Sequence, residues 1–344
     1  MNIRATNIRT MNIKTIKKIL VKTIAASALA VALTALSVSI YAYEPPRMAD
    51  GKPELQGLWS NSSVTDLERP SGINKLVLSE EEALAMAAGD DLVGRVISDA
   101  RPTDPNAGLL DGSDLLAGRG YNTFWIDPGM QVGKVKGEYR SSWIVDPSDG
   151  KIPYSNDGKK IATQSRSYRN NFDGPEIRPL GERCLATTGR TGPPMINGLY
   201  NNHYQIVQAP EHILILSEMV QHARVVTLKG EHPPKEVKFM FGHSIGWWEG
   251  DTLVVETTNF HPMHLRYAHP LFHTEDSKVI ERFTRYSKDQ LLYEFTIEDP
   301  NLYTQIWHGE SRFNQLDKPI YEYACHEGNY SMPGILSGAR REGS

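Results

Sequence analysis

The eleven histidines of this 344-residue chain all lie between His203 and His326, and the first 202 residues contain none. Histidine titrates near physiological pH and is the commonest metal ligand in proteins. If the protein performs acid–base or metal chemistry, most of the residues for it are therefore in the C-terminal half.

The most suggestive local pair is Glu218 with His222, which flank Met219–Gln221 between two strand-like runs. If those runs form a hairpin, the two side chains sit on facing strands at the end of the sheet. A carboxylate beside an imidazole raises the histidine pKa and fixes the ring, which suits a general base or a metal ligand. The alternative is an ordinary cross-strand ion pair.

Hydrogen-bonding side chains gather just upstream, at Tyr200, Asn201, Asn202 and His203, immediately before a predicted strand. Such a rim could orient a polar ligand at the mouth of a barrel, with His203 as a second catalytic candidate. The alternative is turn chemistry, because asparagine tolerates left-handed backbone. Arg183 could hold an anionic group, or could pair with one of the many acidic residues.

A metal set is the weaker alternative for these residues. His243 lies in a glycine-flanked segment and is expected to bind substrate at the rim of the barrel cavity. With Glu218 and His222 it could instead complete a nitrogen and oxygen ligand set. The spacing is far less specific than an HExxH or paired CxxC pattern, so no cofactor is expected and a divalent metal stays the alternative. The histidine-rich stretch 261–273 reads as a loop that lines the site. Trp307 reads as cavity lining or core.

The N-terminus predicts export. A basic region without acidic residues precedes the apolar run Ile24–Ile40, and Ala42 offers a cleavage point, so residues 1–42 read as a signal peptide. The alternative is an uncleaved anchor. Without those residues the net charge falls from −4 to −10. We expect a soluble periplasmic or secreted protein that does not bind nucleic acid or, after cleavage, a membrane.

Cys184 and Cys325 are the only cysteines. An exported chain with an even cysteine count favours a disulfide, which would stabilise the protein by roughly 5 kcal/mol in the loop-entropy model. The alternatives are two buried thiols, or a reactive thiol beside His326.

Two regions follow the signal peptide and are expected to form one globular unit. Residues 43–137 are rich in turn-forming residues and predict a wrapping segment with one helix, which starts at a Ser79 capping box and stops near Gly89. Residues 138–344 read as short strands joined by turns. Strands at this spacing predict a mainly β fold, an antiparallel β-barrel or sandwich that is lipocalin-like in general shape. The later strands are expected at Tyr204–Gln208, Ile213–Glu218, Ala223–Leu228, Ile245–Trp248, Thr252–Thr257, Val279–Tyr286, Leu291–Ile297 and Tyr303–His308.

Several motifs resemble those of a family of uncharacterised exported bacterial proteins. They are Glu182–Leu185 (ERCL), Tyr200–Asn202 with Gln205–Gln208 (YNN and QIVQ), Trp248–Phe260 (WEGDTLVVETTNF) and Tyr321–Tyr330 (YEYACHEGNY). The resemblance spans most of the mature chain and implies an exported protein of environmental bacteria, without a reaction. Members tend to carry Asp where this chain has His243, which weakens His243 as a metal ligand.

These patterns together favour an exported enzyme that uses acid–base chemistry, as a lyase, isomerase or hydrolase, on a small and partly apolar organic molecule. Glu218 or His222 would abstract a proton, while Asn202 and Arg183 would stabilise developing negative charge. His222→Ala should then abolish turnover without unfolding the protein. The alternative is a non-catalytic ligand-binding protein that uses the same barrel cavity.

Overall fold

The computed structural model describes residues 43–99, 126–167, 170–185, 190–264, 271, 273–327 and 329–342. The predicted signal peptide lies outside these residues, and so do His269 and much of its loop. Within the described ranges, no helix is long and apolar enough to cross a membrane.

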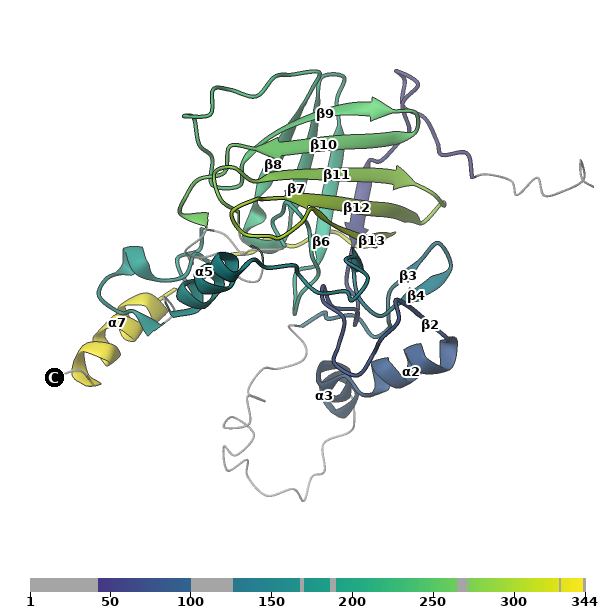
Figure 1. Cartoon of the computed structure of the whole chain (residues 1–344). Coiled ribbons are helices and arrows are strands. Elements are labelled where there is room, and N and C mark those ends of the chain that lie inside the picture. The colour runs from purple at the N-terminus through teal and green to yellow at the C-terminus, as the bar shows by residue number, and fades with distance from the viewer. Residues whose placement is uncertain are drawn as a thin grey trace, which may run out of the picture. The chain divides into compact units, whose positions relative to one another are not determined.

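Nine strands of one sheet close into a barrel, because β1 pairs with both β6 and β13 (Figure 1). In order around the barrel these are β1 (Gly57–Ser60), β6 (His203–Gln208), β7 (His212–Ser217), β8 (Ala223–Leu228), β9 (His243–Glu249), β10 (Thr252–Thr258), β11 (Lys278–Arg285), β12 (Gln290–Glu298) and β13 (Trp307–Gln315). A short strand, β5 (Ile144–Asp146), also pairs with β13. The predicted mainly β barrel is confirmed.

One pairing departs from the predicted antiparallel order. Strands β8 and β9 run parallel, with Val226 opposite Ser244. A parallel pair needs a crossover connection rather than a tight turn, and residues 229–242 supply it. The barrel is therefore mixed.

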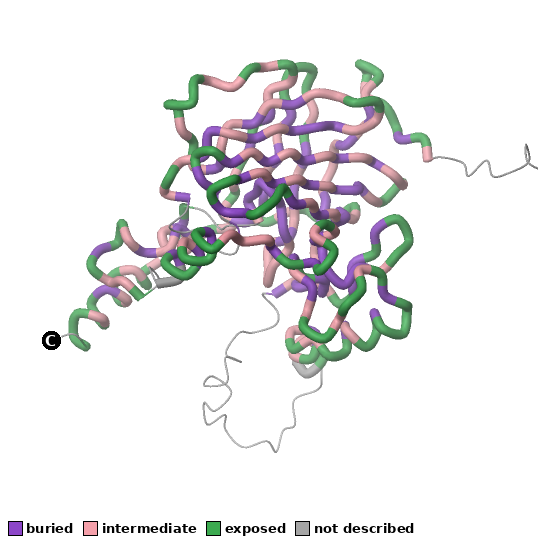
Figure 2. Tube along the Cα trace, viewed as in Figure 1, coloured by how far each residue is buried: buried purple, intermediate pink, exposed green. Residues whose placement is uncertain are grey.

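Alternation along the strands fills the interior. On β12, Leu291, Tyr293, Phe295 and Ile297 are all 1% exposed or less, while the residues between them are more accessible (Figure 2). Successive side chains of a strand point to opposite faces, so this pattern places one face of β12 in the apolar core.

The last barrel strand lies later in the sequence than its hydrophobic pattern indicates. Residues 303–308 were expected to form it, whereas β13 spans Trp307–Gln315. Two of its inward positions are Gly309 and Ser311, which give no apolar signal. A Cβ at Gly309 would lie 2.1 Å from the Phe295 ring, so the aromatic ring of β12 occupies the volume that a side chain would need.

The N-terminal segment does more than wrap the barrel. Residues 57–60 form β1, and Trp59 of that strand is fully buried in the core. The predicted helix is α2 (Glu80–Ala88), with the Ser79–Glu82 capping box in place and Gly89 at its C-cap. A second helix that the sequence did not predict, α3 (Asp91–Asp99), follows directly.

Smaller elements lie outside the barrel strands. A separate three-stranded sheet joins β2 (Val77–Leu78), β4 (Glu138–Arg140) and β3 (Lys134–Val135). Further helical elements within the described ranges are α5 (Asn156–Ser167), the 3-10 turns η3 (Pro175–Ile177) and η4 (Met219–Gln221), and α7 (Ser331–Glu342).

Candidate functional site

The barrel interior carries a buried charge cluster. Arg224 and Glu281 form an ion pair at 2.5 Å, and both are almost completely excluded from solvent. The Tyr293 hydroxyl donates to the same carboxylate at 2.7 Å and accepts from the backbone N–H of Met195 at 2.8 Å. These contacts join β8, β11 and β12 inside the core, while the buried Nε of Arg224 has no hydrogen-bond partner among the described residues. The cluster therefore connects strands of the barrel.

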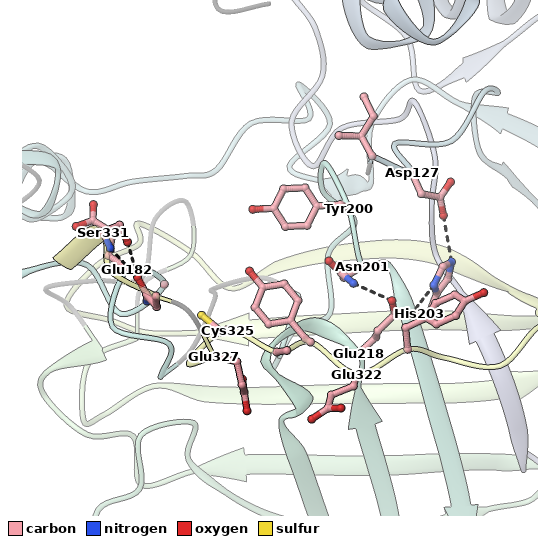
Figure 3. Close-up of a pocket in the computed structure, with 16 residues that line it drawn as sticks. Asp127, Glu182, Tyr200, Asn201, His203, Glu218, Glu322, Cys325, Glu327 and Ser331 are labelled. Carbon is pink, nitrogen blue, oxygen red and sulfur yellow. Dashed lines mark hydrogen bonds and ion pairs between the residues drawn. The ribbon is translucent and has the colours of Figure 1, made fainter. Parts of the chain in front are cut away.

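A cavity of about 930 Å³ lies outside this core, at the ends of β6 and β7 (Figure 3). His203 stands in its wall between two carboxylates. Its Nδ1 lies 2.6 Å from Glu218 Oε2, and its Nε2 lies 3.1 Å from Asp127 Oδ2. The Asn201 amide donates to the other oxygen of Glu218 at 2.7 Å. Asp127, His203 and Glu218 therefore form one hydrogen-bonded array, which we call the carboxylate–imidazole array.

The β6–β7 hairpin explains why His203 meets Glu218. Tyr204 pairs with Ser217 in the antiparallel register, so residues 203 and 218 form the next pair along the two strands. The backbone N–H of Glu218 donates to the carbonyl of His203 at 2.9 Å, which holds that register at the end of the hairpin. Asn201 adopts a left-handed φ of 54°, and its amide reaches back to the carboxylate.

A loop contact places Asp127. The buried Asn202 amide donates to the backbone carbonyl of Asp127 at 2.6 Å, and the Asp127 N–H donates to the Leu199 carbonyl at 3.0 Å. The other Asn202 contacts close its own loop, at the N–H and carbonyl of Gly198. Asn202 was predicted to stabilise negative charge on a substrate, but its donors are directed to backbone carbonyls, so it shapes the site instead.

The array is electrostatically asymmetric. Glu218 is 4% exposed and Asp127 is 47% exposed, with His203 between them at 19%. Burial lowers the pKa of His203, but the hydrogen bonds to Asp127 and Glu218 outweigh it and raise that pKa to about 9. At neutral pH the ring is an imidazolium that donates to a fixed carboxylate on one side and an accessible one on the other.

The opposite wall comes from the C-terminal segment 321–331, which we call the C-terminal wall. It supplies Tyr321, Tyr323, Glu322 and Glu327, while Tyr200 lines the same cavity. The predicted disulfide is confirmed: Cys184 and Cys325 are bonded, with their Cα atoms 5.6 Å apart. Cys325 itself lines the cavity.

The structure separates His222 from Glu218. The expected ion pair between them does not form among the described residues, because Glu218 turns to His203 and Asn201. The His222 ring instead packs on Phe241, with their centroids 4.3 Å apart. Burial and the nearby Arg224 lower the pKa of His222 to about 4, and His222 is not among the described residues that line the cavity.

Of the other residues predicted to contact a ligand, some line the cavity and others do not. Tyr200 lines the cavity, and the Arg190 guanidinium lies over its ring at 5.0 Å. Arg183 donates to the backbone carbonyl of Glu176 at 3.1 Å and is not among the described lining residues. Trp307 is fully buried in the barrel core against Phe295, which makes it a core residue.

His243 belongs to another part of the barrel. Its Nδ1 lies 3.0 Å from that of His232, whose Nε2 is 3.3 Å from a Glu256 carboxylate oxygen. The structure therefore does not assemble the alternative metal set of Glu218, His222 and His243. Across the described ranges, no group of three histidine, cysteine or acidic side chains is placed to hold a metal ion.

Residues 242–246 read G-x-S-x-G, the pattern of a serine-nucleophile elbow. The elbow needs a sharp strand-to-helix turn at the serine. Ser244 instead lies within β9, and the strand continues after it to Glu249. Its hydroxyl is buried and shares a 2.8 Å hydrogen bond with Thr257. This serine is therefore not presented as a nucleophile.

Sequence reasoning identified His203 and Glu218 separately but missed Asp127 and the role of Asn201. The hairpin register could have paired His203 with Glu218. Asp127 carries no local signal, because long-range contacts with Asn202 and Leu199 bring it to His203. No family model and no curated protein matches the chain.

Proposed function

We propose that the protein is an exported enzyme whose acid–base centre is the carboxylate–imidazole array, acting on a small, partly apolar organic molecule. The observation that supports this most is His203, held between a buried carboxylate and an accessible one in the wall of a 930 Å³ cavity. A cavity with convergent polar groups and a perturbed pKa is the usual setting of a catalytic site.

Each member of the array has a distinct role in this proposal. Glu218 is a positioning residue, because it is buried and receives hydrogen bonds from His203 and Asn201. Asp127 is the general base, since its half-exposed carboxylate can reach a substrate. His203 is the general acid, because its raised pKa keeps a proton on Nε2 at neutral pH.

The proton transfers balance within the array. Asp127 takes a proton from a carbon or from a water molecule, and His203 gives its Nε2 proton to the oxygen on which negative charge develops. The two groups are 3.1 Å apart, so they can serve neighbouring atoms of one substrate. A later proton transfer from Asp127 to His203, directly or through water, restores the resting state. Lyase, isomerase and hydrolase reactions all use this pair of steps.

The rival function is non-catalytic binding in the same cavity. The three tyrosines Tyr200, Tyr321 and Tyr323 favour it, because their rings offer broad contact to an apolar ligand and their hydroxyls offer hydrogen bonds. In that case His203 would change affinity without any turnover.

Paired variants test the proposal. Wild type, His203→Gln, Asp127→Asn and His222→Ala would be incubated in deuterated buffer with a panel of small ketones, lactones and esters. Proton NMR then follows deuterium exchange at carbon and hydrolysis. We expect activity in wild type and His222→Ala, and a loss of about 100-fold or more in the other two.

The outcomes separate the hypotheses. Wild-type turnover by the folded His203→Gln variant would contradict the proposal. Loss of turnover in His222→Ala alone would favour the role that the sequence assigned to His222. Compounds that bind and never react, in any variant, would support the binding protein.

A further inference from the structure

The C-terminal wall forms half of the cavity lining. It contributes eight of the sixteen described residues that line the cavity, all between Tyr321 and Ser331. None of its described residues pairs in a strand. Its described backbone hydrogen bonds are local: the N–H of Cys325 donates to Tyr323, that of Asn329 to His326, and that of Gly334 in the following helix to Tyr330.

Its covalent connection runs to a well-anchored turn. Cys325 is bonded to Cys184, and the Asn329 amide donates to the Cys184 sulfur at 3.2 Å. The turn around Cys184 is held by its own backbone hydrogen bonds, including one from Leu185 to Leu180, whose side chain is 1% exposed. The wall also contacts the barrel side through a side-chain hydrogen bond between Tyr323 and Tyr200. The disulfide is therefore the covalent link between a buried support and a wall whose backbone hydrogen bonds are local.

The cavity also gives access to the disulfide. Cys184 is 8% exposed, whereas Cys325 lines the cavity directly. A thiolate would therefore reach the Cys325 sulfur through the cavity, and a bound molecule would stand in its path.

We propose that the Cys184–Cys325 disulfide is a latch: its reduction releases the C-terminal wall and opens the cavity. This regulation rests on the proposed function only in taking the cavity as the working site. A dithiol attacks the Cys325 sulfur and forms a mixed disulfide, and Cys184 leaves as a thiolate and takes up a proton. The second thiol of the reductant then closes its own disulfide and releases Cys325, so two electrons and two protons pass to the protein.

The latch and the cavity are linked in both directions. If the oxidised wall favours a bound ligand, the bound ligand must favour the oxidised wall by the same factor. At a fixed ratio of dithiol to its disulfide, a smaller fraction of occupied protein than of empty protein should therefore be reduced at equilibrium.

Hydrogen exchange of the full chain tests the latch without any substrate. Mass spectrometry would compare oxidised protein with protein reduced by dithiothreitol, following peptides that cover residues 321–331 and, as internal control, β11 and β12. We expect exchange in the C-terminal wall to become at least about tenfold faster on reduction, with the barrel strands unchanged. The Cys184→Ser/Cys325→Ser double variant should reproduce the reduced pattern.

Two results would overturn the inference. Unchanged exchange in 321–331 would mean that other contacts hold the wall. Faster exchange across the barrel strands as well would make the disulfide a general stabiliser rather than a latch. Neither result depends on catalysis. The His203→Gln variant should show the same increase in exchange on reduction as wild type, so the latch can be refuted independently of the proposed function.

Discussion

The charge on His203 makes stability depend on pH in a direction that can be worked out. Its pKa is raised from 6.5 to about 9 by Asp127 and Glu218, against the effect of burial. A raised pKa in the folded state stabilises the fold fully below the unfolded value of 6.5. That stabilisation is then lost as the pH rises through about 9.

The magnitude follows from the two pKa values. Their difference corresponds to about 3 kcal/mol, an upper value because Asp127 is half exposed and solvent screens its charge. Urea unfolding of wild type and His203→Gln, measured from about pH 6 to pH 10, isolates this contribution. The stability advantage of wild type should be constant below about pH 6.5 and shrink by up to about 3 kcal/mol at alkaline pH.

His222 provides a matched control of opposite sign. Its pKa is lowered from 6.5 to about 4, so its neutral form stabilises the fold above 6.5 and that contribution is lost as the pH falls towards 4. The difference between wild type and His222→Gln should therefore change on the acid side. A pH-independent difference between wild type and His203→Gln, or one that grows with pH, would refute the reasoning.

Four further predictions concern three positions. Asn201→Gly keeps the left-handed backbone but removes the hydrogen bond to the buried Glu218, and should cost about 1–3 kcal/mol by urea unfolding. Asn201→Ala should be about 1 kcal/mol less stable again, because alanine resists a φ of 54°, and equal stability would contradict this. Gly309→Ala should lower stability by about 1–3 kcal/mol because its methyl group meets the Phe295 ring, and an unchanged thermal midpoint would argue otherwise. Activity in the proposed assay should fall above about pH 9 as His203 loses its proton, and an alkaline limit near 7 would contradict His203 as the acid.

The barrel could be predicted from the sequence because its strands alternate strongly. The alternation at Leu291–Ile297 and the Ser79 capping box both depend on neighbours in sequence, and the structure contains both. The last barrel strand, β13, was harder to predict, since Gly309 and Ser311 interrupt its hydrophobic alternation. The Phe295 ring of β12 fills the space beside Gly309. The parallel β8–β9 pair depends on a crossover that no local signal marks.

The candidate site was only partly predictable, because it too depends on contacts between residues that are distant in sequence. His203 and Glu218 were both named as candidates, but each was assigned a different local context. The actual pairing is set by hairpin register, and Asp127 joins through a contact over 76 positions of sequence. The two bonded cysteines are 141 residues apart, so sequence proximity does not predict their disulfide. The prediction came from the expected oxidising compartment and the even cysteine count.

The most direct test of the central claim is a compound screen followed through the histidine ring ¹⁵N resonances of the folded protein. We predict that compounds which bind in the cavity will perturb the His203 Nε2 resonance by competing with Asp127, while the His222 and His308 resonances stay unchanged. If bound compounds leave His203 unperturbed and shift His222 instead, the carboxylate–imidazole array is not the working site.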